Sequence, residues 1–117
     1  MPIKLYCMKG RLLTDLGRFP EAYKEYQKAL EMSGKRDAYS RMGLANIHYE
    51  TSTLQRGNLE VQESELRKAM QQYFSVLEID ECNTAACLGI ANVLSEYNKV
   101  TEAKEIFKVI ETSETDS

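Results

Sequence analysis

The chemistry that this sequence could support begins with one histidine and three cysteines. His48 is the only histidine, and the cysteines are Cys7, Cys82 and Cys87. Acid/base or nucleophilic catalysis would need the imidazole beside a carboxylate and a nucleophile, and no spacing in the sequence specifies such partners. His48 is expected near the end of a helix, lining a groove or solvated. The cysteines are odd in number and have no CxxC spacing, so neither a disulfide framework nor a zinc site is predicted.

No other pattern points to a reaction. Cys7 is a conceivable nucleophile, but no base is specified beside it, and an inert, partly buried thiol in a reducing compartment is expected. Gly10 and Gly17 are expected in a helix and a turn, so they form no phosphate-binding loop. The sequence therefore predicts a protein that is not an enzyme and that has no metal site and no cofactor.

Composition and charge narrow the class further. With 117 residues, 43% of them hydrophobic and 28% charged, the chain is expected to be one small soluble domain without a membrane span or export signal. The net charge of −3 hides a gradient, because residues 1–36 carry eight basic and four acidic side chains while the remainder is acidic. This balance, without an aromatic platform, argues against direct nucleic-acid binding.

The elements that must position any site show an internal repeat. A small residue, an aromatic ring and another small or apolar residue recur as Ala22/Tyr26/Ala29, Ala69/Tyr73/Val76 and Ala103/Phe107/Ile110. Upstream of each lies a second set, which reads Tyr6/Lys9/Gly10/Leu13, Tyr39/Met42/Gly43/Asn46 and Cys87/Ile90/Ala91/Leu94. The interval from Ala69 to Ala103 is 34 residues. Small residues at these positions let helices approach closely, and the rings fill the space between repeats.

This pattern resembles the tetratricopeptide repeat (TPR), a 34-residue helix-turn-helix unit. The resemblance implies an all-α solenoid of three helix-turn-helix repeats, at 3–35, 36–83 and 84–117, that form a single array. Lys9 and Cys87 depart from the pattern, and no repeat ends in proline. Because each repeat packs on the next, the uncovered apolar face after Ala103 suggests an array excised from a longer solenoid. A basic front and an acidic rear predict weak self-association of the fragment.

The middle repeat carries 14 extra residues between its two helices. One interpretation is a disordered loop, which the polar composition favours. The other is a lengthened hairpin that turns at Arg56, Gly57 and Asn58, because Leu59, Leu66 and Tyr73 recur at seven-residue spacing. We expect the hairpin, which would project about 10 Å beyond its neighbours if each helix gains about seven residues.

A more specific resemblance covers residues 39–110, through "YSRMGLANIHYETST" and, after the insertion, "KAMQQYFSVLEIDECNTAACLGIANVLSEYNKVTEAKEIFKVI". These stretches resemble the Cln-three-requiring-nine family, the TPR scaffold subunit of the RNA polymerase II-associated factor (PAF) complex. The resemblance implies a nuclear protein whose partners are other PAF-complex subunits. It further implies a role in transcription elongation and in cotranscriptional histone modification.

The binding site is expected in the concave groove formed by the first helix of each repeat. The predicted partner-binding residues are Lys4, Cys7, Arg11, Thr14, Ser40, Leu44, Ile47, His48, Leu88, Asn92 and Ser95. Basic residues at the entrance and apolar residues deeper in would suit a segment with acidic and apolar side chains.

Two alternative functions stay open at this point. One is a co-chaperone-type receptor that clamps the carboxylate of a peptide tail, although the corresponding positions, Cys7, Arg11, Arg41, Ala85 and Gly89, do not reproduce that clamp. The other is an architectural spacer whose groove binds nothing.

Overall fold

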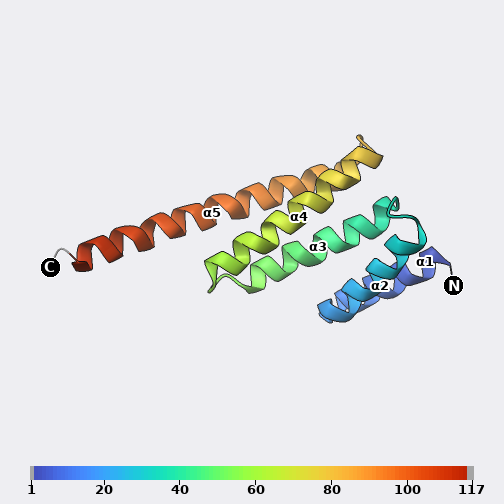
Figure 1. The fold of residues 1–117 in the computed structure, drawn as a ribbon, viewed down its shortest axis with the longest axis horizontal. Coiled ribbons are helices and arrows are strands. Elements are labelled where there is room, and N and C mark those ends of the chain that lie inside the picture. The colour runs from blue at the N-terminus through green and yellow to red at the C-terminus, as the bar shows by residue number, and fades with distance from the viewer. Residues whose placement is uncertain (1, 116–117) are drawn as a thin grey trace.

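The protein folds into α-helices joined by short turns. The computed structural model describes residues 2–115, with α1 (Ile3–Asp15), α2 (Phe19–Met32), α3 (Ala38–Leu54), α4 (Leu59–Ile79) and α5 (Thr84–Thr115). α1 and α2 form one hairpin, α3 and α4 form a second, and α5 runs back along α4 (Figure 1). The predicted all-α helical repeat fold is confirmed.

Local sequence signals begin and end these helices. Pro20 lies in the first turn of α2, and Gly34 has a φ of 68° just after that helix ends. Asp37, Asn58 and Asn83 precede α3, α4 and α5. Each of their side chains accepts a hydrogen bond from a backbone N–H of the following turn, at 3.1, 3.2 and 2.9 Å. Such a cap stabilises a helix by about 1 kcal/mol.

The helices stack into an elongated molecule of 64 × 29 × 20 Å. α3 is the central element, because it contacts α1 and α2 on one side and α4 and α5 on the other. Two apolar clusters result. The first joins α1, α2 and α3 and contains Cys7, Ala22, Tyr26, Ala29, Leu30, Leu44 and Ile47. The second joins α3, α4 and α5 and contains Ala45, Leu66, Ala69, Tyr73, Val76, Ala86, Val93 and Val100.

Two tyrosines fill the space between neighbouring helices, as the repeat pattern predicts. A Cβ added to Gly43 would lie 2.4 Å from the Tyr26 ring, and one added to Gly10 would lie 2.9 Å from it. Tyr73 occupies the same kind of place in the second cluster, 2.4 Å from a Cβ added to Gly89. Only glycine lets the helix backbones approach the rings this closely.

The insertion in the middle repeat is helical. α3 has 17 residues and α4 has 21, against 13 and 14 in α1 and α2, and the turn between them lies at residues 55–58. The predicted lengthened hairpin is therefore correct, although the two helices gain four and seven residues rather than seven each. Leu66 is fully buried under α5, whereas Leu54 at the tip is 69% exposed.

The third repeat differs from the prediction. Residues 84–115 form one continuous helix of 32 residues instead of a hairpin. Its small-residue contact is Gly89 rather than Ala91, and Cys87, Ala91 and Leu94 are exposed. The sequence permits a continuous helix, because no glycine or proline follows Gly89 and nothing interrupts the helical hydrogen bonding.

One carboxylate is buried where α5 crosses the tip of the second hairpin. The side chain of Glu96 is 6% exposed and lies 3.0 Å from an Arg56 guanidinium nitrogen. Gln62 donates a hydrogen bond to its other oxygen at 3.4 Å. These partners come from the α3–α4 turn and from α4, so Glu96 fixes the alignment of α5 on the lengthened hairpin.

Candidate functional site

A cavity of about 450 Å³, which we call the groove cavity, lies between α1, α3 and the start of α5. It is lined by Arg11, Thr14, Asp15, Tyr26, Tyr39, Met42, Gly43, Asn46, Asn83 and Ala85. These residues come mainly from α1, α3 and the start of α5, which are the first helices of the three repeats. Its volume falls within the range of about 300–1,000 Å³ that is usual for ligand pockets.

Helix packing forms the inner wall of the groove cavity. The Tyr26 side chain reaches from α2 between α1 and α3, where Gly10 and Gly43 leave room for the ring. Burial raises the pKa of Tyr26 to about 12, so its hydroxyl is protonated at neutral pH and can donate a hydrogen bond. The wall therefore offers an aromatic surface with a neutral polar group.

Hydrogen bonds from neighbouring side chains fix the positions of Asn46 and Tyr39 in the groove cavity. Tyr73 donates a hydrogen bond to the side-chain oxygen of Asn46 at 2.6 Å, and burial raises the pKa of Tyr73 to about 12. Among the described residues, no hydrogen bond is donated by the Asn46 amide nitrogen, which is available to a ligand. Arg11 donates to the Tyr39 hydroxyl at 3.5 Å. The cavity thus combines one cation, the Asp15 carboxylate, two phenol rings and amide groups, which suits a peptide segment.

Some predicted site residues come together in the groove cavity. Arg11 and Thr14 line the groove cavity. Lys4 and Cys7 lie at the N-terminal end of α1 and line a second cavity of about 410 Å³ with Ile3, Met8, Asp37 and Tyr39. Lys4 and Arg11, which were predicted at the entrance of one groove, therefore line two different cavities.

The residues of α3 that were predicted to line the groove lie on the buried face of this helix. Ser40, Leu44 and Ile47 are 0%, 2% and 4% exposed, so they pack in the helix stack and cannot line an open surface. Cys7, at 4% exposed, is nearly buried as well. The stripe that faces the groove is Tyr39, Met42 and Asn46, which the repeat pattern had assigned to packing. The physical reason is that α3 buries its more apolar stripe against the first hairpin.

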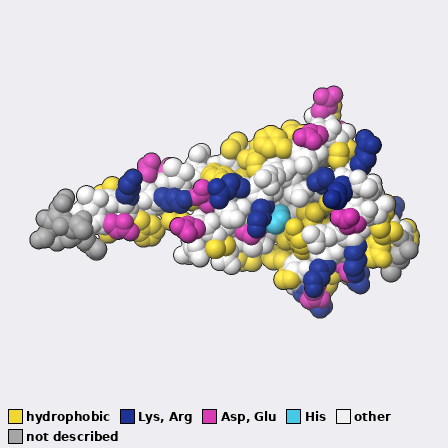
Figure 2. All heavy atoms as spheres, viewed as in Figure 1, with side chains coloured by type: hydrophobic (Ala, Val, Ile, Leu, Met, Phe, Trp, Pro, Cys, Tyr) yellow, Lys and Arg dark blue, Asp and Glu magenta, His cyan; other side chains and the backbone are white. Residues whose placement is uncertain are grey.

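His48 lies outside the groove cavity and connects three helices. Its Nδ1 is 2.7 Å from a carboxylate oxygen of Glu65 on α4, and its ring meets Tyr23 of α2 edge-on at 5.4 Å. The space-filling view shows the imidazole reaching the surface between neighbouring helices (Figure 2). The expected groove-lining or solvated role is wrong, because the ring is mostly covered by packing between repeats.

The predictions for the third repeat also miss the groove cavity. Leu88, Asn92 and Ser95 are exposed on α5, and the groove cavity instead takes Asn83 and Ala85 from the start of that helix.

The structure adds groove residues that the sequence reasoning missed. They are Asp15, Tyr26, Tyr39, Met42, Gly43, Asn46, Asn83 and Ala85. A usable signal was present in α3, where one stripe contains Leu44 and Ile47 and the adjacent stripe contains Tyr39 and Asn46. When a helix carries two candidate stripes, the more polar one is expected to face solvent.

Cys7 belongs to a small polar cluster beneath α1. Its sulfur lies 3.4 Å from the Ser40 hydroxyl and 3.6 Å from Asp37, and Ser40 also bonds to Asp37. Burial is the main cause that raises the pKa of the Cys7 thiol, so at neutral pH it is a thiol rather than a nucleophilic thiolate. Within residues 2–115, no group of histidine, cysteine and acidic side chains is arranged to hold a metal ion.

Comparison with known proteins supports the helical repeat fold. Residues 3–36 match the family described as tetratricopeptide repeat. A search of curated proteins found no match to the chain. None of the helices in the described part of the chain has an apolar stretch long enough to cross a membrane. The fold and the match together define a TPR-like helical repeat, and repeats of this class generally mediate protein–protein interactions through extended concave surfaces.

Proposed function

We propose that the chain is a scaffold segment that binds a peptide segment of a partner protein in the groove cavity. The observation that carries this proposal is the cavity of about 450 Å³ between α1, α3 and α5, with Tyr26 forming its wall. Arg11 is suited to an acidic side chain, Tyr39 and Met42 to an apolar one, and the Asn46 amide to the peptide backbone. The expected occupant is therefore a segment that alternates acidic and apolar residues.

The specific form of this proposal is a subunit of the PAF complex. It rests on the resemblance of residues 39–110 to the Cln-three-requiring-nine family, in which a repeat is interrupted by a charged helical stretch. The helical insertion of α3 and α4 supports it, since the extra residues are ordered and include the charged side chains Glu60 and Glu63. On this proposal the protein acts in the nucleus, during RNA polymerase II elongation and the accompanying histone modification.

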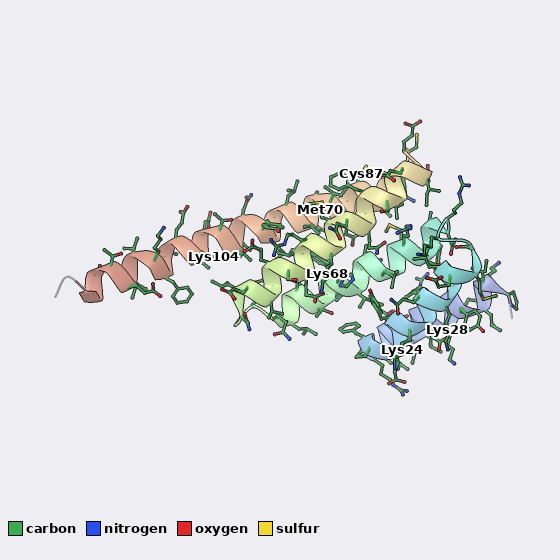
Figure 3. All side chains as sticks on the ribbon, in the orientation of Figure 1. Lys24, Lys28, Lys68, Met70, Cys87 and Lys104 are labelled. Carbon is green, nitrogen blue, oxygen red and sulfur yellow. The ribbon has the colours of Figure 1, made fainter. Side chains whose placement is uncertain are left out.

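Affinity capture with the 117-residue chain as bait tests both the binding of a partner in the groove cavity and the assignment to the PAF complex. The groove variant is Arg11→Glu with Tyr39→Ala, because both side chains are exposed and line the groove cavity. The matched control is Lys68→Glu with Phe74→Ala on α4, which likewise reverses one positive charge and removes one aromatic ring, at residues outside the cavity; Lys68 is labelled in Figure 3. Recovery of PAF-complex subunits by wild type and control, and their loss with the groove variant, is the expected result.

The other outcomes separate the alternatives. Recovery of PAF-complex subunits by all three baits would support the complex but overturn the groove cavity as its site. Recovery of a cytosolic chaperone instead, lost when the chaperone tail is amidated, would replace the proposal with a tail receptor. Recovery of no partner by any bait would favour an architectural spacer.

A further inference from the structure

α5 carries one continuous stripe along its length, with alternating three- and four-residue spacing. The stripe consists of Ala86, Gly89, Val93, Glu96, Val100, Ala103, Phe107 and Ile110. Its first half, through Val100, is buried against the second hairpin. Residues 102–113, here called the α5 arm, extend past the tip of that hairpin (Figure 1). The same stripe that packs on α4 therefore continues uncovered.

The α5 arm is apolar on one side. Ile106, Phe107, Val109 and Ile110 are 60%, 56%, 66% and 47% exposed, and apolar side chains are visible among the charged ones on this arm (Figure 2). At about 100° per residue, Glu102 lies between Val109 and Ile106, and Glu105 lies just beyond Val109, so both carboxylates are at the Val109 edge of the apolar side. Neither carboxylate takes part in an ion pair among the described residues. The arm thus presents an apolar surface with an acidic edge.

The opposite edge of the arm carries Lys104, Lys108 and Glu111, and Lys104 already joins it to the hairpin. Lys104 pairs with Glu63 in the first turns of α4, and the stick view shows it beside the tip of the hairpin (Figure 3). Lys108 follows one turn later. The acidic edge is therefore the edge at which a partner's cations can add new pairs.

A second uncovered apolar surface lies on α1. Leu5, Met8, Leu12 and Leu16 are 44%, 60%, 62% and 63% exposed and recur at intervals of three and four residues. This arrangement places them on the side of α1 that faces away from α2, with Met8 at the margin of the second cavity. The edges of the stripe are mainly basic. They carry Lys4, Arg11 and Lys9, with Asp15 as the one acidic residue.

The two surfaces match in length, polarity and charge. Leu5 to Leu16 and Glu102 to Ser113 each span about 17 Å at 1.5 Å per residue. Each presents four large apolar side chains. The edge of α1 with Lys4 and Arg11, which also carries Asp15, has a net positive charge and complements the edge with Glu102 and Glu105. They lie at opposite ends of the elongated molecule, so one copy cannot bring its own two surfaces together (Figure 1). A second copy can.

We propose that the protein associates head to tail, with the exposed face of α1 on one copy docking against the α5 arm of the next copy. The contact would continue the α4–α5 packing with a helix from the second copy. Because the two docked surfaces differ, each pair leaves one α1 face and one α5 arm free, so association extends beyond the dimer. This proposal concerns self-assembly and does not depend on the groove cavity.

The expected association is weak and salt-dependent. Four half-exposed side chains on each face bury on the order of 400 Å² per copy, about half of the roughly 800 Å² that each partner buries in a standard stable complex. Sedimentation from roughly 10 µM to about 1 mM should therefore show a weight-average mass that rises steadily. Added salt should shift that rise to higher concentration, since the edge charges are exposed.

Two blocked variants provide the decisive test. One carries Leu5→Glu and Leu12→Glu and keeps its α5 arm. The other carries Phe107→Glu and Ile110→Glu and keeps its α1 face. Each alone is expected to stay monomeric, whereas their mixture should reach a heterodimer and stop at twice the monomer mass. Leu54→Glu with Phe74→Glu, which changes exposed apolar residues off both faces, should associate like wild type.

Every other result overturns the proposal. If the variant with the altered α1 still self-associates, the contact is a symmetric pairing of α5 arms. If wild type is monomeric throughout, or if the mixture shows no heterodimer, the two faces do not bind each other. Helical circular dichroism confirms that each variant is folded. In addition, a variant with Glu102→Lys and Glu105→Lys should associate more weakly with a copy that has the wild-type α1 face. Its association should recover with a copy that carries Lys4→Glu and Arg11→Glu.

Discussion

Replacing Gly43 with alanine tests the packing on which the groove cavity depends. The added Cβ would lie 2.4 Å from Cε1 and Cζ of Tyr26, about 1 Å inside ordinary van der Waals contact. The ring cannot retreat, because its opposite edge lies against Gly10, where a Cβ would be 2.9 Å from Cε2. The neighbouring helices must therefore separate.

The size of the effect follows from two opposing contributions. Overpacking a close contact destabilises by about 1–3 kcal/mol, and the constrained ring places this site at the upper end. Alanine in a helix interior recovers up to about 1 kcal/mol of intrinsic propensity relative to glycine. We therefore expect Gly43→Ala to lower the free energy of unfolding by about 2 kcal/mol, with a fall in Tm of roughly 6–10 °C.

Urea denaturation followed by circular dichroism measures this change. Gly57→Ala is the matched control, because a Cβ there meets nothing within 4 Å and its stability should be unchanged or slightly higher. In a Tyr26→Leu background, Gly43→Ala should cost at least about 1 kcal/mol less than in wild type, since the clash is relieved. A Gly43→Ala protein as stable as wild type would refute the reasoning.

Three further predictions follow from the buried groups and the long helix. Glu96→Leu should lower the free energy of unfolding by about 1–3 kcal/mol, because it leaves the amide of Gln62, which is 3% exposed, without its hydrogen-bond acceptor; unchanged stability in urea unfolding would contradict this. Because burial raises the pKa of Cys7, mass spectrometry at pH 8 should show it alkylated more slowly than the exposed Cys82; equal rates would contradict it. Spin labels at Ser95 and Ser113, in a cysteine-free background, should lie about 27 Å apart along one continuous helix, whereas a hairpin would bring them much closer.

The sequence by itself determined the repeat architecture of the first two hairpins. Gly10 and Gly43 are spaced from Tyr26 so that small residues meet the ring, and this local pattern survives into the structure unchanged. The caps at Asp37 and Asn83 and the turn around Gly57 were also readable, because a few neighbouring residues decide where a helix begins and ends.

Tertiary structure decided the face of α3 that lines the groove and the course of α5. α3 carries two stripes, and only its position between both hairpins selects the one with Leu44 and Ile47 for burial. The repeat pattern around Ala103 favoured a second turn in α5, yet that helix continues because its stripe packs against the lengthened hairpin as far as Val100. A periodic sequence specifies which residues can share a face, but the neighbours that cover that face exist only in the folded chain.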